Sequence, residues 1–523
     1  MARTPLAGLV TRLFRDARGA DVSRLPAAEF VEQRAGNLQT RREFLGHSGK
    51  AVLAAAGAAT LGIDALAAGS RSSQVAIIGA GLAGLTCALR LRKAGIDSTV
   101  YEANDRLGGR CFTRRGFFAD QQLVERGGEL IDTDHTAVQE LASELGLGLD
   151  DLLLAEPAGT SPFYRFNGRA YSYAQILRRF QAIYPKLQAD LEAVGDIDYT
   201  GATPRGYRLD HTSLADYIDQ LTDDDVLAEL LNVAYAIEYG AETGNQTALN
   251  LLFLLGYSPR NSFDIFGGSD ERYHIRGGND QLVSRMASLL TGSIQTGAPL
   301  AAIRQKTDGR YRLDFASGSG VKSVVADHVI LALPFSVLRS SVDYSKAGFS
   351  PLKVTAIETQ GMGASAKLHL QFRSRHWNTL GNNGDTFADT GYQNTWESTR
   401  AQAGKSGILN NFTGGNTALR YGTGTLAQRT AEALRNLEPV LPGLSDRFNG
   451  LSTLDFWPGN PWSRGSYSYW KVGQYSSIAG SEGLREGNIH FCGEHTSFDY
   501  QGYLNGAVDT GNTAAAELIA DLA

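Results

Sequence analysis

The sequence has few cysteines, no excess of positive charge and no long hydrophobic run, and each absence excludes a class of protein. Its three cysteines are an odd number without the paired spacing of metal ligands, so a scaffold built on disulfides is excluded. The net charge is −6, which gives no electrostatic reason to expect nucleic acid as a partner. No uncharged apolar run reaches the ~20 residues of a membrane-spanning helix, so we expect no integral membrane anchor.

The chain does have length and glycine. At 523 residues it exceeds one ordinary domain, and its hydrophobic and charged fractions, 42% and 20%, are those of a globular protein. Its 60 glycines exceed the usual ~7% of residues, which indicates many tight turns and places where the backbone closely approaches another group. We therefore expect two or three structural units and a core large enough to enclose a cofactor.

The first seventy residues differ from the rest of the chain. Arg41 and Arg42 are followed by Phe44, by a mildly apolar stretch over 49–63 and by a small-residue pattern at 65–67. This order is typical of a twin-arginine export signal, although the leader before it is unusually long. An arginine-rich surface helix is the alternative. The signal predicts that the folded protein is exported to the periplasm or the exterior.

The segment from Gln74 onward predicts a strand, a tight turn and a helix. Residues 75–78 are a short apolar run, residues 79–84 are Gly-Ala-Gly-Leu-Ala-Gly, and apolar residues then recur at helical spacing. Gly79 would permit the turn, Gly81 would let the backbone reach a pyrophosphate, and Gly84 would let the helix pack against the sheet. This pattern is typical of a dinucleotide-binding site.

A second strand is predicted at 98–101 and ends at Glu102, whose carboxylate could accept hydrogen bonds from ribose hydroxyls. Because strand, turn, helix, strand and acid follow one another in register, the pattern is stronger than an isolated glycine-rich turn. The sequence at 104–110, Asn-Asp-Arg-Leu-Gly-Gly-Arg, resembles the FAD-binding signature of glutathione-reductase-like flavoproteins. That resemblance implies that Arg110 meets the pyrophosphate, and it favours FAD over NAD.

The C-terminal region carries a second motif, Cys-Gly-Glu-His-Thr-Ser at 492–497 followed by Gly-Tyr-Leu-Asn-Gly-Ala at 502–507. From Gln74 to the end, the chain resembles the flavin-containing amine oxidases, which include monoamine, polyamine and L-amino-acid oxidases. The resemblance implies that Glu494 binds the ribityl or pyrophosphate region and that the 502–507 backbone passes beside the flavin ring.

Weaker matches to the same family lie between the two motifs, with plain turns as the alternative. Arg-Gly-Gly-Glu-Leu at 126–130 stands where the family passes a glycine pair beside the flavin, residues 275–280 would open a helix beneath the cofactor, and Leu300 would cover the adenine. The implied cofactor-binding residues are Gly79, Gly81, Ala83, Gly84, Glu102, Ala103, Gly108, Gly109, Arg110, Gly127, Gly128, Glu129, Leu300, Gly493, Glu494, Gly502, Leu504 and Ala507.

Lys367 is the predicted catalytic residue. It stands in an alternating apolar stretch, Ala-Lys-Leu-His-Leu at 366–370, where a charged ammonium needs an explanation because its desolvation is costly. In the family, a lysine on the matching strand holds a water near flavin N5 and assists the reaction of reduced flavin with oxygen. A lysine at a strand edge that extends its ammonium into solvent is the alternative.

Two tyrosines are predicted to face the flavin. Monoamine oxidases place a tyrosine pair perpendicular to the ring, and Tyr467 and Tyr503 fit those positions, although ordinary core aromatics would give the same pattern. Where monoamine oxidases link a cysteine to the flavin, this chain has Ser466, which cannot form a thioether. The resemblance therefore implies noncovalent FAD, hydride transfer from the substrate α-carbon to N5, hydrolysis of the resulting imine, and reoxidation by molecular oxygen with release of hydrogen peroxide.

The sequence defines the substrate less well. L-amino-acid oxidases hold the substrate carboxylate with an arginine two residues after the position of Gly128, but this chain has Leu130 there. Trp396 is a candidate donor in place of that arginine. We expect an L-amino-acid oxidase, because an exported chain without a membrane anchor suits that group by analogy. A monoamine or polyamine oxidase is the alternative, and a flavin desaturase or a noncatalytic flavoprotein are readings from other classes.

The expected fold is α/β: a glutathione-reductase-like FAD-binding Rossmann domain on a parallel sheet, interleaved with an α+β substrate domain. The FAD-binding domain would comprise residues 71–150, 270–345 and 458–523, and the substrate domain residues 151–269 and 346–457. Residues 137–252 are expected to be helical, followed by a mixed sheet that contains Lys367 and Trp396. No metal site is predicted, since no second Cys/His pair accompanies Cys492 and His495. The resemblance also implies a homodimer.

Overall fold

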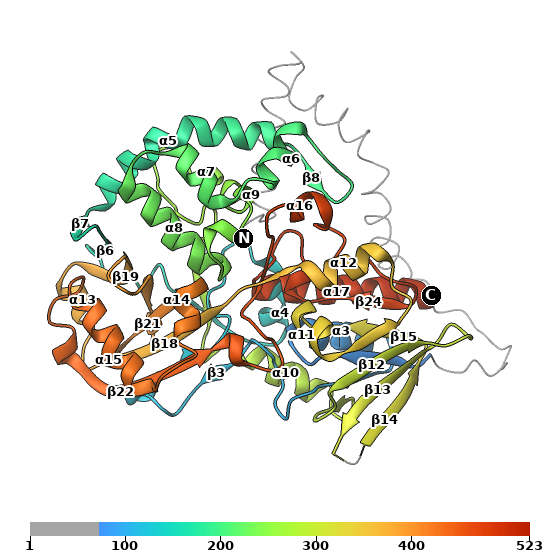
Figure 1. The fold of residues 1–523 in the computed structure, drawn as a ribbon. Helices are drawn as coiled ribbons and strands as arrows, with labels where there is room; N and C mark the ends of the chain where they lie inside the picture. The colour runs from blue at the N-terminus through green and yellow to red at the C-terminus, as the bar shows by residue number, and fades with distance from the viewer. Residues whose placement is uncertain (1–72, 319) are drawn as a thin grey trace, which may run out of the picture.

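The computed structural model describes residues 73–318 and 320–523, so the predicted export signal lies outside the described residues and stays a prediction. Figure 1 shows two parts side by side: a parallel sheet with its covering helices, and a second sheet with a layer of helices above it. The predicted α/β fold with a parallel sheet is confirmed.

The first part is built on five parallel strands in the order β11-β2-β1-β15-β24. They are β1 (Val75–Ile78), β2 (Ser98–Tyr101), β11 (Ile294–Gln295), β15 (His328–Leu331) and β24 (Ile489–Phe491). The predicted strands at 75–78 and 98–101 are confirmed. All five strands come from the three segments assigned above to the FAD-binding domain; the limits of that domain stay a prediction.

Alternate residues of β1 supply two hydrophobic cores, because successive side chains of a strand point to opposite faces. Ile77 packs in one core with Leu85 of α3 (Leu82–Lys93) and Val508 of α17 (Leu504–Leu522). Ile78 lies in the other core with Leu300 of β12 (Leu300–Gln305). This part is completed by β13 (Tyr311–Ser317), β14 (Gly320–Ala326) and β16 (Asp343–Lys346), which form a sheet with β12, and by α4 (Thr136–Glu144) and α10 (Gln281–Leu289).

The second part contains a seven-stranded sheet in the order β22-β18-β21-β20-β19-β6-β7. Its strands are β6 (Ser161–Phe166), β7 (Arg169–Tyr171), β18 (Ser365–Phe372), β19 (Asn382–Ala388), β20 (Asn394–Glu397), β21 (Gly407–Gly414) and β22 (Phe448–Phe456). The β6–β19 pair is parallel and the other pairs are antiparallel. The predicted mixed sheet with Lys367 and Trp396 is therefore confirmed.

The prediction that residues 137–252 are helical throughout is wrong, because β6 and β7 lie within this range. They form a hairpin whose turn residues, Asn167 and Gly168, have φ angles of 52° and 71°. An Asn-Gly pair between strands favours a turn in which both central residues have positive φ. The turn signal was therefore present in the sequence, and the hairpin adds an edge to the sheet that carries Lys367.

Apart from the short strands β5 (Leu149–Asp151), β8 (Ile197–Asp198) and β9 (Gly201–Ala202), the regular structure in the rest of this range is helical, and these helices lie above the sheet in Figure 1. They are α5 (Tyr173–Val194), α6 (Pro204–Asp210), α7 (Leu214–Leu221), α8 (Asp225–Tyr239) and α9 (Ala248–Leu252). The Asp224 side chain caps α8 by accepting the N–H groups of Val226 and Leu227, and Gly240 ends the helix with a φ of 63°. The Gly240 carbonyl accepts the N–H of Ala364, which ties the end of α8 to the start of β18.

The remaining elements are short. They are α11 (Phe335–Ser341), α12 (Pro351–Thr359), α13 (His376–Thr379), α14 (Gly415–Arg420), α15 (Leu426–Leu437), α16 (Gln474–Ser477), β3 (Thr113–Arg114), β4 (Val124–Glu125), β5 (Leu149–Asp151), β8 (Ile197–Asp198), β9 (Gly201–Ala202), β10 (Tyr273–Ile275), β17 (Gly361–Met362) and β23 (Ser468–Tyr469), with single-turn 3₁₀ segments between them. Within residues 73–318 and 320–523, no helix is both long and apolar enough to cross a membrane.

Gly84→Ala is expected to destabilise the protein by about 1–3 kcal/mol, because a Cβ at this position would lie 2.0 Å from the Gly79 carbonyl oxygen. The measurement is the free energy of unfolding in denaturant. Gly244→Ala is the matched control, since a Cβ there meets nothing within 4 Å. An unfolding midpoint for Gly84→Ala equal to that of the wild type would show that this close contact is not required.

Candidate active site

One cavity lies between the two parts and collects the predicted site residues. It encloses about 1970 Å³ of space not filled by protein atoms, its open mouth included. Every cofactor-binding and substrate-binding residue predicted above lines it, as does Lys367, with the single exception of Gly84. Gly84 instead packs against Gly79 and Ala332, which matches the packing role predicted for it. The tertiary structure thus brings together residues from both ends of the sequence.

Two helices begin at the cavity wall without a side-chain cap. Gly81 is the N-cap of α3 and Tyr503 is the N-cap of α17, and neither accepts a hydrogen bond through its side chain. The first N–H groups of a helix have no partner within the helix, and the helix dipole adds positive potential there. The cavity therefore presents two sites for anionic or carbonyl oxygens, one from each end of the chain.

Glu102 lies at the end of β2, where the sequence predicts a ribose-binding carboxylate. Its two oxygens accept the N–H groups of Ala80 and Asn104, each at 2.8 Å. Burial raises the pKa of Glu102, and these hydrogen bonds oppose the rise. The contacts fix the carboxylate beside the glycine-rich turn and leave lone pairs of both oxygens for a ligand.

Arg110 and Glu494, predicted from the two separate motifs, form an ion pair. Arg110 Nη1 lies 2.5 Å from Glu494 Oε1 and donates to the Ser466 carbonyl at 3.0 Å. Glu494 also accepts the N–H of Gly502 at 2.8 Å and the hydroxyl of Ser468 at 2.7 Å. Burial would raise the pKa of Glu494, but Arg110 and these hydrogen bonds lower it. Glu494 therefore links the two motifs through protein contacts while it lines the cavity.

Lys367 is paired with a buried carboxylate. Its Nζ donates to Glu129 Oε2 at 2.6 Å and to the Glu125 carbonyl at 3.2 Å, and it lies 5.2 Å from the centre of the Trp396 ring. The Lys367 and Glu129 side chains are 7% and 6% exposed. An ammonium has three donors, so these two hydrogen bonds leave one for the cavity. The alternative of a lysine extended into solvent is excluded by this burial.

The charge of Glu129 depends on Lys367. Burial alone would raise the pKa of Glu129, but the ammonium of Lys367 outweighs it and lowers the pKa to about 2. Because the pKa falls on folding, this group stabilises the fold above about pH 4.5, and the contribution is lost as the pH falls toward 2. On the same face of β18, burial and the nearby Lys367 lower the pKa of His369 to about 3, so a neutral imidazole lies beside the pair.

Both predicted tyrosines lie on the cavity wall with their hydroxyls held. The Tyr467 hydroxyl donates to the Ile237 carbonyl at 2.7 Å, and the Tyr503 hydroxyl lies 3.4 Å from Glu238 Oε1. The ring of Tyr503 also packs against His135, with 4.8 Å between ring centres. Ser466 Oγ accepts a hydrogen bond from Ser365 at 2.9 Å. These contacts fix the aromatic walls of one end of the cavity.

Sequence reasoning missed two acids that line this end of the cavity, Glu238 and Glu271. Glu238 follows a run of apolar residues near the end of α8, and an acid in that position was a usable signal. Glu271 carried no signal; it has a φ of 47°, and its N–H donates to Asp132 Oδ1 at 2.9 Å. Although the Glu271 side chain is accessible, it borders a protein-walled cavity, where desolvation and the nearby Asp132 and Glu238 carboxylates raise its pKa.

A model of the flavin containing amine oxidoreductase family matches residues 82–519. The chain belongs to this family. A nicotine dehydrogenase of Pseudomonas putida is 26% identical over 92% of this chain and 97% of its own length. A flavin-dependent L-tryptophan oxidase of Lentzea aerocolonigenes is 26% identical over 84% of this chain and 96% of its own. These two relatives are equally similar to this chain and are named for different substrates, so membership of the family does not define the substrate.

Solved structures show the same fold. Putrescine oxidase bound to putrescine has a TM-score of 0.73 and 23% identity, over 86% of this chain and 99% of that one. Cyclohexylamine oxidase from Brevibacterium oxydans has a TM-score of 0.75 and 21% identity, over 86% and 100% of the two chains. The predicted FAD-binding fold is confirmed by this likeness.

The residues around the cavity fit the flavin cofactor of the family. A Cβ added at Gly81 would meet nothing within 4 Å, so the cavity opens directly beside the backbone where a pyrophosphate would approach. Gly81 and the first turn of α3 would hold that pyrophosphate, with Arg110 as the nearby cation. Glu102 would hold the ribose, and the first turn of α17 would meet the ring near Lys367 and Tyr503. The bound cofactor supplies the acceptor for substrate electrons.

Gly81→Ala is expected to weaken FAD binding by about tenfold or more, because its Cβ would occupy space that the cofactor needs while it touches no protein atom. The dissociation constant is measured by flavin fluorescence, and the unfolding midpoint of the cofactor-free protein is measured alongside. That midpoint should stay at the wild-type value, unlike the midpoint of Gly84→Ala. Unchanged FAD affinity would contradict the placement of the pyrophosphate.

Lys367→Met is expected to abolish most activity and to destabilise the protein by about 3–5 kcal/mol, because it leaves the Glu129 carboxylate buried and unpaired. The double variant Lys367→Met with Glu129→Gln removes that charge, so it should recover most of the stability and none of the activity. Turnover and unfolding free energy are measured on both variants. A double variant that regains activity would show that Lys367 serves only the fold.

Proposed function

We propose that the protein is an FAD-dependent oxidase of a cationic amine that carries no carboxylate on the reacting carbon. The charges on the cavity wall support this choice. In the part of the chain that the structure describes, three cations line the cavity: Arg106, Arg110 and Lys367. Arg106 donates to the Leu107 and Gly109 carbonyls, while Arg110 and Lys367 pair with Glu494 and Glu129. Each cation thus has a protein partner, and none is an unpaired positive charge for a substrate carboxylate.

The acids at the substrate end complement a positive ligand. Glu238 and Glu271 border the cavity near Tyr503, and the pKa values of both are raised by desolvation. A second ammonium on the substrate would relieve this unfavourable burial of negative charge. An amine with a distal cation, such as an aliphatic diamine, therefore fits this end better than an α-amino acid. The monoamine or polyamine oxidase, given above as the alternative, is therefore favoured here over the expected L-amino-acid oxidase.

The chain's own residues have defined tasks in amine oxidation. Tyr467 and Tyr503 orient the neutral amine and exclude water from one side, and their hydroxyls are held by Ile237 and Glu238. Lys367 keeps a third donor that would hold one water at the reacting end. A bound flavin would supply the acceptor for hydride from the substrate α-carbon, with molecular oxygen as the final electron acceptor.

An L-amino-acid oxidase remains the second candidate on two observations. The relatives include an L-tryptophan oxidase and an L-amino acid dehydrogenase of Synechocystis that is 25% identical over 87% of this chain. In addition, the indole of Trp396, the donor predicted for a carboxylate, lines the cavity, and its N–H already acts on the Glu129 carboxylate and helps to lower the pKa of that group. Leu130 also lines the cavity where the family arginine would stand.

Substrates are best compared as pairs that differ only by the carboxylate, such as putrescine with L-ornithine and tryptamine with L-tryptophan. We expect putrescine to bleach the flavin without oxygen at least about tenfold faster than L-ornithine, since the carboxylate finds no free cation. Peroxide release with oxygen present tests the proposed acceptor. Faster bleaching by the amino acid of each pair would favour the second candidate, and no bleaching by any amine would contradict both.

Glu238→Gln and Glu271→Gln test which group the acids recognise. Each should raise the KM for putrescine by about tenfold, the value of one hydrogen bond to a charged group, and leave the KM for a monoamine of the same length unchanged. Glu229→Gln, on the same helix as Glu238 but outside the cavity lining, is the control. Equal effects on the diamine and the monoamine would show that the acids do not bind a distal cation.

FAD is proposed to be noncovalent, because Ser466 holds a hydroxyl where a linking thiol would be needed and its Oγ is occupied by Ser365. Acid precipitation should release all the flavin into the supernatant, measured by absorbance after removal of the protein. Yellow colour that stays with the precipitated protein would contradict this proposal.

A further inference from the structure

A pair of histidines lies on the sheet away from the cavity. His328 is the first residue of β15, and His490 lies on the adjacent parallel strand β24, opposite Ile330. Since residues two apart on a strand share a face, and paired residues of neighbouring strands point the same way, both imidazoles leave the sheet on the face of Ile330. Helix α17 covers that face, because Ile330 packs in one core with Val508 and Leu518.

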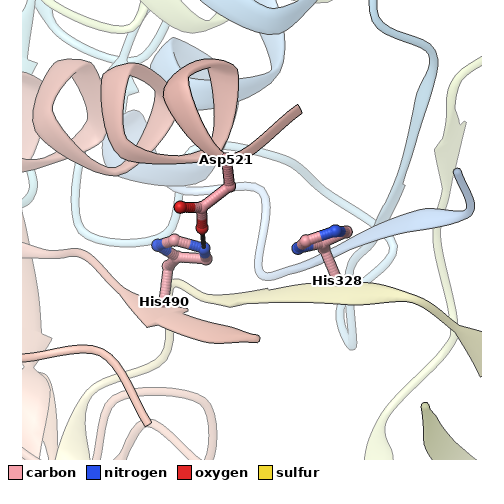
Figure 2. A group of neighbouring side chains, drawn as sticks. All are labelled: His328, His490 and Asp521. Carbon is pink, nitrogen blue, oxygen red and sulfur yellow. Dashed lines mark ion pairs between the residues drawn. The ribbon is translucent and has the colours of Figure 1, made fainter. Parts of the chain in front are cut away.

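The last turns of α17 bring two carboxylates to the same place. Glu517 and Asp521 are four residues apart and therefore lie on one side of the helix. Glu517 Oε2 lies 2.9 Å from His490 Nδ1, and Asp521 Oδ2 lies 3.5 Å from His490 Nε2. Figure 2 shows Asp521 above His490, with His328 beside them on the neighbouring strand. One donor atom from each of His328, His490 and Asp521 lies within 4.8 Å of the others.

The position of the proton on His490 decides the character of this cluster. If Nδ1 donates its hydrogen to Glu517 and the ring is neutral, the lone pair is on Nε2. That nitrogen is fully buried and has no hydrogen-bond partner, and it faces the Asp521 carboxylate. His328 is 9% exposed, and its Nδ1 is likewise buried without a partner. In that tautomer, Nε2 and the Asp521 oxygen are two electron-pair donors 3.5 Å apart, and a cation between them would offset their repulsion.

We propose that His328, His490 and Asp521 bind one divalent transition-metal ion, for which Zn²⁺ is the reference. Two imidazoles and one carboxylate suit such an ion, and the partly exposed Asp521 side leaves room for water as a fourth ligand. Glu517 is the outer carboxylate that orients His490. At bond lengths of about 2.1 Å, tetrahedral ligand atoms are about 3.4 Å apart, so side-chain rotation must contract the present separations.

A competing cation is already present. Arg485 Nη1 lies 2.6 and 2.5 Å from the two Asp521 oxygens, with its side chain half exposed. This arginine neutralises Asp521 without the metal, so the ion has to share or displace it. The cavity lining does not include the two histidines, the two carboxylates or Arg485, whereas the first turn of α17 does border the cavity. The metal would therefore fasten the end of α17 to the sheet and act on stability rather than on the reaction.

The experiment uses the full-length, tag-free, FAD-loaded protein after dialysis against a chelator. Zn²⁺ uptake is measured by equilibrium dialysis with elemental analysis, and Co²⁺ provides an absorption spectrum that reports imidazole ligation. We expect one ion per chain at micromolar Zn²⁺ and a higher melting temperature with the metal. His328→Gln and Asp521→Asn should each weaken binding by about tenfold or more and remove the rise in melting temperature.

Two further variants separate the site from general effects. His211→Gln, an exposed histidine elsewhere, should bind Zn²⁺ as the wild type does. Arg485→Gln removes the competing cation and should bind at least as tightly as the wild type. The proposal is overturned by less than one ion per chain at a large Zn²⁺ excess, by equal binding in Asp521→Asn and the wild type, or by weaker binding in Arg485→Gln. Less than one ion per chain would indicate that a proton on His490, and not a metal ion, lies between the donor atoms.

Discussion

The cofactor cavity depends on backbone contacts so close that only glycine permits them. A Cβ at Gly84 would lie 2.0 Å from the Gly79 carbonyl oxygen, and a Cβ at Gly511 would lie 2.5 Å from that of Ala83. The first contact holds α3 against the turn after β1, and the second holds α17 against α3. Because these helices approach so closely, their uncapped N-termini open on one cavity, and their dipoles add there. Two motifs at opposite ends of the chain become one site for this reason.

The charges of the site are balanced before any substrate enters. Buried ionic groups are costly unless they are paired, and the cavity follows this rule with the Lys367–Glu129 and Arg110–Glu494 pairs. Each pair joins segments that are distant in sequence, so it fixes the position of a functional group as well as its charge. Glu238 and Glu271 also border the cavity, and the proposed function assigns them the recognition of a positive group on the substrate.

Helix α17 connects two regions with different chemistry. Its first turn lines the cofactor cavity near the carboxyl ends of the parallel strands, and its last turn lies over His328, at the start of β15. In a parallel sheet the carboxyl ends of the strands hold ligands, while the opposite edge lies away from the ligand site. The histidine cluster at that opposite edge is thus placed to hold the helix in position.

Much of the nucleotide-binding part could be predicted because it depends on short stretches of chain. The apolar run at 75–78, the glycines at 79–84 and the acid at Glu102 lie close together in sequence, and each has a local physical reason. Lys367 could also be predicted, since an ammonium in an apolar strand is unfavourable without a partner. The hairpin at 161–171 was missed although its Asn167-Gly168 turn was visible, because the helical pattern that follows it was extended too far.

The amino-acid sequence by itself determined the parallel-sheet fold, the class of cofactor and the lysine that lines the cavity. Only the tertiary structure decided that Glu129 is the partner of Lys367, that Glu238 and Glu271 border the substrate end, and that His328 and His490 meet Asp521. The physical reason is the range of the interactions. Turns, caps and strand periodicity act over a few residues, whereas a pairing of charges across a sheet or a helix depends on how the whole chain packs.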